Sequence, residues 1–303
     1  MWWFRALQVV VLAGAAYYLA RVAAPHWPAI RSRGLAWHLG PLAASAVLVL
    51  ATLSVLLAAW TATLHWCGAQ VRYRDAARIW FTANLARFIP GTVWQFASLA
   101  AMASRYQVSM IAATATVLLE QVVLLITGLL VIAALTPAVL HAAWWQTALA
   151  AAAVLGAAGL ALPRPSGRVG HWLERRFPGI RLLWSGVTPA RLAGFVATLV
   201  VPWVLYGIAF RLLALGLLGA PPPGGSWEFF IAAFTGSYVA GVIAVFAPAG
   251  LLVREAALIG LLSPLLGSGD AVILAAASRI WLTALEVLAA VVVLALPTLP
   301  EAP

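Results

Sequence analysis

The sequence predicts an all-α polytopic membrane protein with about six full transmembrane helices and two re-entrant broken-helix hairpins, arranged as an inverted repeat. Of its 303 residues, 64% are apolar and 9% are charged, and the mean hydropathy is +1.01. A soluble domain is about 45–50% apolar and about 25% charged. Several apolar runs also exceed the roughly 20 residues that cross a bilayer. Soluble enzymes, disordered chains and fibrous chains are therefore excluded.

Eight apolar segments follow one another along a single integral membrane domain, residues 1–303. They are 2–20, 41–64, 79–103, 108–135, 142–162, 192–219, 227–266 and 270–297. The first segment carries Arg5 and opens with Trp2 and Trp3, which are typical of interfacial anchors. Because no soluble domain follows it, we interpret it as a transmembrane helix and not as a signal peptide.

Two of these segments, 79–103 and 227–266, are interrupted in their middle. The first contains Pro90 and Gly91, and the second is too long for one span and contains Pro248-Ala249-Gly250. Proline removes a backbone donor and clashes with the preceding turn. Broken helices at membrane depth are tolerated only where they are buried in protein or line a wet cavity. Both segments are therefore predicted to be re-entrant.

Arginines between the segments predict the orientation. Every basic residue is arginine, and loop 163–191 holds six of them, which is typical of a cytoplasmic loop. A re-entrant 79–103 leaves one more loop arginine on that side than a fully crossing 79–103 does, so re-entry is favoured. Segment 227–266 then enters from the opposite side. Both termini are expected in the cytoplasm, at the inner cell membrane.

The two halves of the chain also echo each other. Phe81-Thr82-Ala83-Asn84 precedes the first break, and Phe234-Thr235-Gly236-Ser237 precedes the second. Interrupted segments at corresponding places are typical of inverted-repeat transporters with a site at the repeat interface. We therefore expect one repeat at 41–135 and another at 192–297.

Ionisable residues inside the apolar segments are the candidate site. They are costly there and normally face a bundle interior or a water-filled cavity. The candidates for binding a lipid head group are Arg87, Arg254, Arg279, Asn84 and Gln95. The candidates for charge balance or proton relay are Glu120, Glu255 and Glu286. The helix breaks at Pro90, Gly91, Pro248 and Gly250 would add backbone donors for a phosphate.

Pairing among these charges is open at this point. Arg279 and Glu286 share a helix face but lie two turns apart, so each needs a partner from another segment. Arg87 with Glu286, or Arg254 with Glu120, would satisfy both. The alternative is a set of internal ion pairs that only fix the packing of the bundle. Outside the spans, Asp75 and Arg78 are interpreted as a surface helical pair.

Catalytic and metal-binding motifs are missing from the sequence. It has no His-Glu-x-x-His helix and no glycine-rich phosphate loop. No histidine follows Ser237 to act as its base, and the five histidines lack metal-ligand spacing. Cys67 is the single cysteine, which excludes a disulfide framework. We expect no enzyme activity, no cofactor and no metal site, and the placement of basic charge in short loops argues against nucleic acid.

The two broken segments resemble the lysylphosphatidylglycerol synthase transmembrane-region family. The first signature is Arg87-Phe88-Ile89-Pro90-Gly91-Thr92-Val93-Trp94-Gln95, followed by Val108-Ser109 and Leu119-Glu120. The second runs from Ser237-Tyr238-Val239-Ala240-Gly241 to Pro248-Ala249-Gly250-Leu251-Leu252-Val253-Arg254-Glu255, with Arg279 at the place of a late arginine. The chain departs from the family at Thr92, where a basic residue is common, and at Leu252, where glycine is common.

The resemblance implies a flippase-like protein, similar to the flippase half of the multiple peptide resistance factor. It does not imply aminoacyl transfer, because the soluble transferase domain of the synthases is absent. We expect the chain to move an anionic phospholipid or a polyisoprenoid-linked lipid between leaflets, with membrane lipids as its partners. The alternative is a non-transporting membrane partner of a glycosyltransferase or a lipid-modifying enzyme.

Overall fold

The computed structural model describes residues 37–86, 93–135, 187–219, 225–244 and 252–296, together with 148–150, 152, 156, 172, 175, 176 and 250. The expected spans 2–20 and 142–162 (apart from a few isolated positions), and most of the loop 163–191, lie outside these residues. The helices are α3 (Leu39–Trp66), α4 (Tyr73–Ala86), α5 (Val93–Arg105), α6 (Met110–Leu135), α10 (Pro189–Leu218), α11 (Trp227–Ile243), α12 (Val253–Leu266) and α13 (Ser268–Ala295). The described part of the chain contains no strand.

Four of the described helices, α3, α6, α10 and α13, are long and apolar enough to cross a membrane. They have 26 to 30 residues each, and a helix of this length measures about 40 Å, more than the roughly 30 Å hydrocarbon core. They coincide with the expected spans 41–64, 108–135, 192–219 and 270–297. The prediction of an α-helical, membrane-embedded protein is confirmed at this level.

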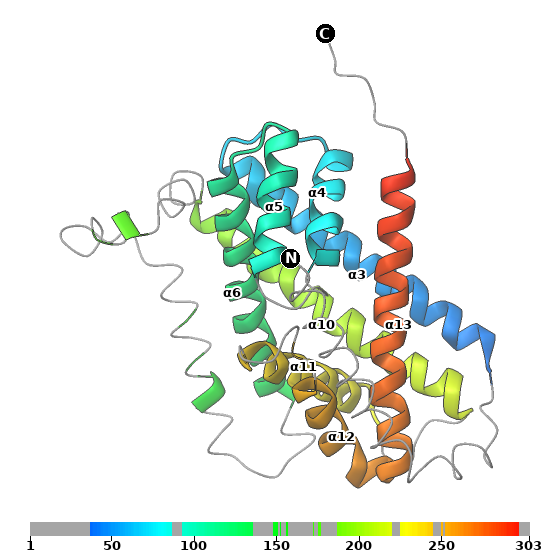
Figure 1. Ribbon diagram of the computed structural model, residues 1–303. Coiled ribbons are helices and arrows are strands. Elements are labelled where there is room, and N and C mark those ends of the chain that lie inside the picture. The colour runs from blue at the N-terminus through cyan, green and yellow to red at the C-terminus, as the bar shows by residue number, and fades with distance from the viewer. Residues whose placement is uncertain are drawn as a thin grey trace, which may run out of the picture.

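The helices α3 and α10 run antiparallel through the middle of the molecule (Figure 1). Their close approach depends on Gly216, where an added Cβ would lie 2.6 Å from the Leu42 side chain. The Ser45 hydroxyl donates to the Ala209 carbonyl across the same interface, at 2.8 Å. Small residues and interhelical hydrogen bonds are the usual means of helix association in lipid, where apolar contact alone gives no driving force.

Two indole N–H groups fasten α6 to this pair. Trp60 of α3 donates to the Thr116 hydroxyl at 3.1 Å, and Trp203 of α10 donates to the Thr127 hydroxyl at 3.0 Å. All four side chains are buried. Both bonds therefore satisfy polar groups that would otherwise be stranded away from water.

Two pairs of short helices lie at opposite ends of the molecule, α4 with α5 at one end and α11 with α12 at the other (Figure 1). Arg78 near the start of α4 donates to the Tyr106 hydroxyl just beyond α5, so these two helices are antiparallel. Phe230 of α11 packs in one apolar cluster with Leu262 of α12, and Gly241 approaches Gly250, which makes the second pair antiparallel as well.

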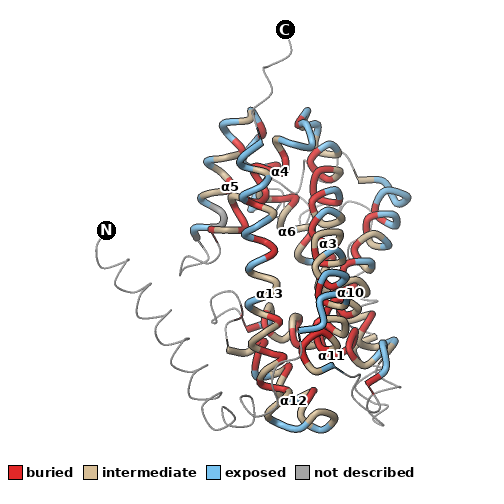
Figure 2. The backbone as a smooth tube through the Cα atoms, turned by 90° about the vertical axis from the view of Figure 1, so that its right-hand side faces the viewer, coloured by how far each residue is buried: buried red, intermediate tan, exposed pale blue. Residues whose placement is uncertain are grey.

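The helix α13 connects the two ends. Its first half carries Leu274, which packs in one apolar cluster with α11 and α12, whereas Ala290 in its second half packs with residues of α4; Figure 2 shows α13 running from one end to the other. The helix has 28 residues, which corresponds to a length of about 42 Å. A single helix therefore contacts both short-helix pairs.

Candidate functional site

The structure brings three of the expected site residues together where α12 begins. Arg254 and Glu255 lie in the first turn of α12, and Arg279 of α13 approaches Glu255, with 3.6 Å between the guanidinium Nη1 and the carboxylate Oε1. Arg254 and Glu255 are 7% and 4% exposed. We call these three residues the arginine cluster.

The local backbone explains why α12 begins at this point. Gly250 has a φ of +64°, and Leu252 has a φ of +72°, so the chain turns sharply just before the helix. An added Cβ on Gly250 would lie 2.8 Å from the Gly241 carbonyl oxygen and 2.9 Å from its Cα. Only glycine lets the two backbones meet this closely. The break that the sequence predicts at Gly250 is therefore a tight crossing of α11 by the chain entering α12.

Glu255 closes the start of the helix. Its Oε2 accepts a hydrogen bond from the Leu252 N–H at 2.8 Å, which satisfies one of the backbone donors that a helix leaves unpaired at its beginning. The other carboxylate oxygen faces Arg279. Glu255 thus joins the helix start to α13, and both of its oxygens are engaged.

Arg254 lies against aromatic rings of α11. Its guanidinium carbon is 4.9 Å from the centre of the Phe234 ring and 5.5 Å from the centre of the Tyr238 ring, within the range of a cation–π interaction. One of its terminal nitrogens, Nη2, is buried and has no hydrogen-bond partner among the described residues. A buried guanidinium with an unused donor is equipped to bind an oxyanion.

The charges of the cluster do not cancel. The cluster contains two guanidinium groups and one carboxylate, so these three residues together carry one more positive than negative charge. Arg279 lies 11 residues after the start of α13 and 16 before its end, about 16 Å and 24 Å along the axis. The excess charge therefore lies well inside the length of a long apolar helix, where a charged side chain is costly.

The remaining expected site residues lie elsewhere. Asn84 is buried in α4, in the other short-helix pair, and Glu120 is buried in α6. Glu286 is buried in the second half of α13, about 10 Å beyond Arg279. Gln95 is in α5, and its side chain is not described. Arg87, Pro90, Gly91 and Pro248 lie outside the described residues.

Two expectations about charge pairing are wrong. Arg254 forms no ion pair with Glu120, because its side chain turns toward the rings of α11. Arg78 is not a surface partner of Asp75: it is 9% exposed and donates to the Tyr106 hydroxyl and to the Leu296 carbonyl at the end of α13. The pairing of Arg87 with Glu286 involves a residue that is not described.

The sequence argument missed the aromatic side of the site. Phe234 and Tyr238 lie four residues apart on α11, so both face the start of α12. The sequence did carry a signal for this contact. Two aromatic residues stand at helical spacing in α11, and an arginine stands in the first turn of the helix that follows, α12. Over the described ranges, no group of three histidine, cysteine or acidic residues is arranged to hold a metal ion.

Comparison of the chain with protein-family profiles, with curated proteins and with solved structures finds no match in any of the three. The resemblance to the lysylphosphatidylglycerol synthase transmembrane-region family stays a prediction.

Proposed function

We propose that this protein moves a lipid with an anionic phosphate-bearing head group between the leaflets of the inner cell membrane. The observation that carries the proposal is Arg254 in the arginine cluster: its guanidinium is a buried positive charge, 7% exposed, and its Nη2 is a donor with no hydrogen-bond partner among the described residues. An anion brought from outside would satisfy both. Phosphate is the natural candidate, because the guanidinium fork matches its geometry.

The short-helix pairs support a transport pathway. The helices α4, α5, α11 and α12 have 13 to 17 residues, about 20–26 Å each, which is less than the roughly 30 Å hydrocarbon core. We propose that each pair forms a re-entrant hairpin, one from either side, within an inverted repeat that also has about six full spans. The α4–α5 hairpin would enter from the cytoplasmic side, on which we also expect both termini.

A second candidate function is supported by the bonds of Glu255. Because one of its oxygens accepts from the helix start and the other faces Arg279, the cluster could serve only to fix α12 against α13. The chain would then be a non-transporting membrane partner of a glycosyltransferase or a lipid-modifying enzyme. The two functions differ in whether Arg254 must bind a lipid.

Leaflet translocation in proteoliposomes tests the proposal. Head-group-labelled phosphatidylglycerol, its lysyl form and an undecaprenyl-phosphate sugar are compared with protein-free liposomes. We expect wild type to accelerate one of these lipids at least tenfold, and Arg254→Ala and Glu255→Gln to abolish the acceleration. Arg105→Ala is the matched control, because Arg105 is an exposed arginine in the last turn of α5 and should transport like wild type.

Folding is monitored by helix content and by the midpoint of thermal unfolding in detergent. If folded wild-type protein accelerates none of the three lipids, the transport proposal fails and the partner function becomes the better explanation. Co-purification of a glycosyltransferase or a lipid-modifying enzyme would then be tested next. If Arg254→Ala transports as well as wild type, the arginine cluster is not the lipid site.

A further inference from the structure

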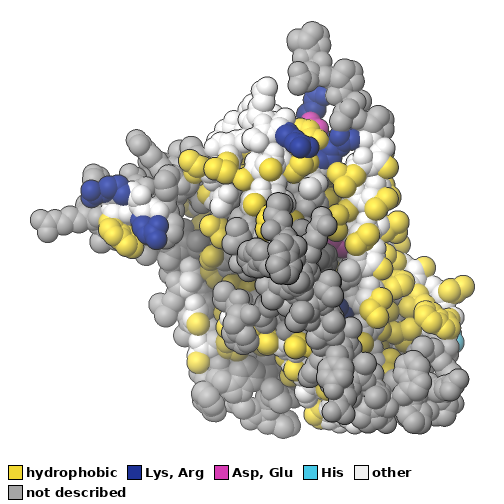
Figure 3. Space-filling view, in the orientation of Figure 1, with side chains coloured by type: hydrophobic (Ala, Val, Ile, Leu, Met, Phe, Trp, Pro, Cys, Tyr) yellow, Lys and Arg dark blue, Asp and Glu magenta, His cyan; other side chains and the backbone are white. Residues whose placement is uncertain are grey.

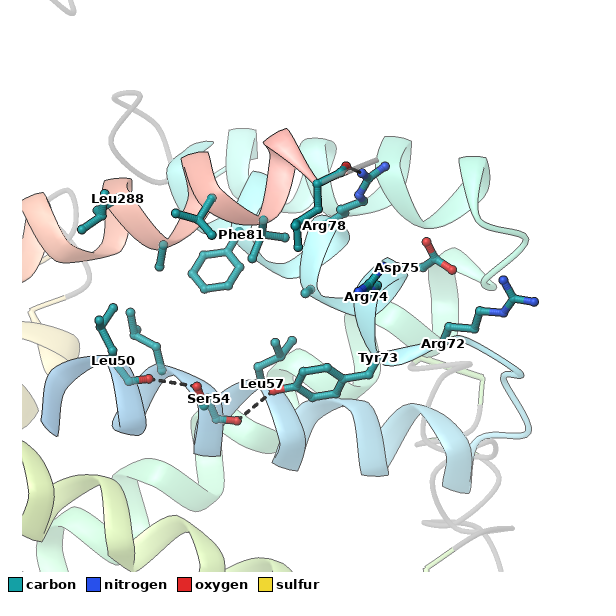
Figure 4. Close-up of a pocket in the computed structure, with 16 residues that line it drawn as sticks. Leu50, Ser54, Leu57, Arg72, Tyr73, Arg74, Asp75, Arg78, Phe81 and Leu288 are labelled. Atoms are coloured by element: carbon teal, nitrogen blue, oxygen red, sulfur yellow. Dashed lines mark hydrogen bonds between the residues drawn. The ribbon is translucent and has the colours of Figure 1, made fainter. Parts of the chain in front are cut away.

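A second feature suited to a lipid lies at the opposite end of the molecule from the arginine cluster. A partly open cavity of about 640 Å³ is lined by α3, by the start of α4 and by the second half of α13 (Figure 4). This volume falls within the roughly 300–1,000 Å³ of ordinary small-molecule sites. The sequence argument placed no site here.

The lining of the cavity is divided by polarity along its length. Figure 4 places Arg72, Arg74 and Asp75 at one end and Leu50 and Leu288 at the other. The apolar walls come from α3 and α13, and the charged end comes from Arg72, just before α4, and from the first turn of α4. An elongated space with apolar walls and a charged mouth fits an amphiphile better than it fits a uniformly polar or apolar molecule.

The mouth carries an excess of positive charge. Arg72, Arg74 and Arg78 face a single acidic residue, Asp75. Arg78 is occupied, because it holds the end of α13 through the Leu296 carbonyl. Arg72 and Arg74 are exposed, and within the described part of the chain neither side chain has a hydrogen bond or an ion pair. Figure 3 shows basic side chains gathered at this end of the molecule, above the apolar flank of α13.

The cavity also borders an exposed apolar face of α13. Leu288 and Val292 of α13 are 52% and 54% exposed and also line the cavity. The apolar wall of the cavity therefore continues onto the outer face of α13. Leu288 and Leu296 are eight residues apart, about 12 Å, which is close to the roughly 15 Å that one leaflet contributes to the hydrocarbon core. A lipid could therefore enter sideways, without leaving the bilayer.

We propose that this cavity binds one anionic phospholipid, with its phosphate between Arg72 and Arg74 and an acyl chain between α3 and α13. Paired guanidinium groups recognise phosphate through charge-assisted hydrogen bonds. The head-group end of the cavity, at Leu296, lies 17 residues after Arg279, about 25 Å along α13, so a phosphate bound there does not reach the arginine cluster, although a groove along α13 that includes Arg279 shares Leu288 with the cavity. The site is distinct from the transport site proposed above and does not depend on transport.

Lipid-dependent stability and native mass spectrometry of the full chain in detergent test this proposal. Wild type, an Arg72→Ala/Arg74→Ala double variant and the control Arg105→Ala are titrated with phosphatidylglycerol and, separately, with zwitterionic phosphatidylcholine. We expect phosphatidylglycerol to raise the thermal midpoint and to give one retained lipid adduct in wild type and in the control. The double variant should bind it at least tenfold more weakly, and added salt should weaken binding to wild type because the arginines are exposed.

A variant that fills the apolar part gives a second readout. Leu288→Trp places a larger side chain in the wall and should reduce the adduct while Arg72 and Arg74 remain. Equal stabilisation by phosphatidylcholine would mean ordinary boundary lipid and would overturn the proposal, as would an unchanged adduct in the double variant. A dimer that masks the site without any lipid adduct would show that a second copy of the chain covers the cavity.

The same titration separates this proposal from the transport proposal. Arg254→Ala should keep the phosphatidylglycerol adduct and the rise in thermal midpoint, whatever its effect on translocation. If Arg254→Ala loses the adduct and the Arg72→Ala/Arg74→Ala variant keeps it, the bound lipid belongs to the arginine cluster, and the cavity proposal is wrong.

Discussion

Replacing Gly250 by alanine would add one methyl group where the chain crosses α11, and the structure gives two reasons for a large cost. The φ of +64° disfavours any residue with a Cβ by about 1–2 kcal/mol. The new Cβ would also lie 2.8 Å from the Gly241 carbonyl oxygen and 2.9 Å from its Cα. Backbone cannot swing aside as a side chain can, and overpacking of this kind costs about 1–3 kcal/mol. We expect a total of about 2–5 kcal/mol.

Thermal unfolding in detergent measures this effect, with Gly260→Ala as the matched control. Gly260 is in α12, the helix that follows Gly250, and is exposed, and an added Cβ there meets nothing within 4 Å. Alanine should therefore be neutral at Gly260 or stabilising by up to about 1 kcal/mol. Gly250→Ala should lower the midpoint by roughly 5 °C or more. A midpoint within 1 °C of wild type would refute the close backbone crossing.

Three further predictions concern other parts of the fold. A double-mutant cycle of Trp203→Phe with Thr127→Val should give a coupling free energy of about 0.6 kcal/mol, and not above about 1.7 kcal/mol, which is the range for hydrogen bonds between membrane helices. The Trp203 indole N–H donates to the Thr127 hydroxyl at 3.0 Å. Additive effects of the two substitutions would contradict this coupling. Leu252→Gly should raise the thermal midpoint, because it relieves a positive φ that costs about 1 kcal/mol or more in a residue with a Cβ; a lowered midpoint would oppose this. Burial raises the pKa of the Cys67 thiol, so the rate of labelling by a membrane-impermeant maleimide should keep rising above about pH 8.5. With the topology proposed above, the reagent should label Cys67 only from the cytoplasmic side. A rate that levels off below that pH would argue against the burial.

The sequence predicted those features that depend on composition and on local chain chemistry. Four expected spans coincide with long apolar helices, because a run of apolar residues with few charges is a strong signal over 25 residues. The break at Gly250 was also predictable, since proline and glycine act on the backbone where they stand. That Arg279 needs a partner from another segment followed from helical spacing, and Glu255 of α12 is that partner.

The sequence did not predict which buried charges meet, because that depends on how helices pack. Arg254 and Glu120 looked complementary, but the rotation of α12 turns Arg254 toward Phe234. From its local sequence, Arg78 looked like a surface residue. In the structure it is buried and donates to the Leu296 carbonyl, more than 200 residues later in the chain. Contacts of this range leave no local pattern. The cavity between α3 and α13 was missed for the same reason.

The two candidate functions predict different thermal stabilities for an Arg254→Met variant. If the cluster only fixes packing, removing Arg254 deletes a stabilising contact with the α11 rings, and Arg254→Met should lower the thermal midpoint. If Arg254 is kept to bind an anion, Arg254→Met leaves Glu255 and Arg279 as a neutral pair and removes an unmatched buried charge.

Replacing a buried charge with an apolar side chain of similar volume is often neutral or stabilising by about 1–4 kcal/mol. We therefore expect the Arg254→Met protein to unfold at the same temperature as wild type or at a higher one, measured in lipid-free detergent, and to lose lipid translocation. A matched Arg211→Met substitution serves as the control, because Arg211 stacks on Trp227 at 3.8 Å outside the cluster. A variant that is destabilised but still transports would reverse the assignment, since it would make Arg254 a packing residue only.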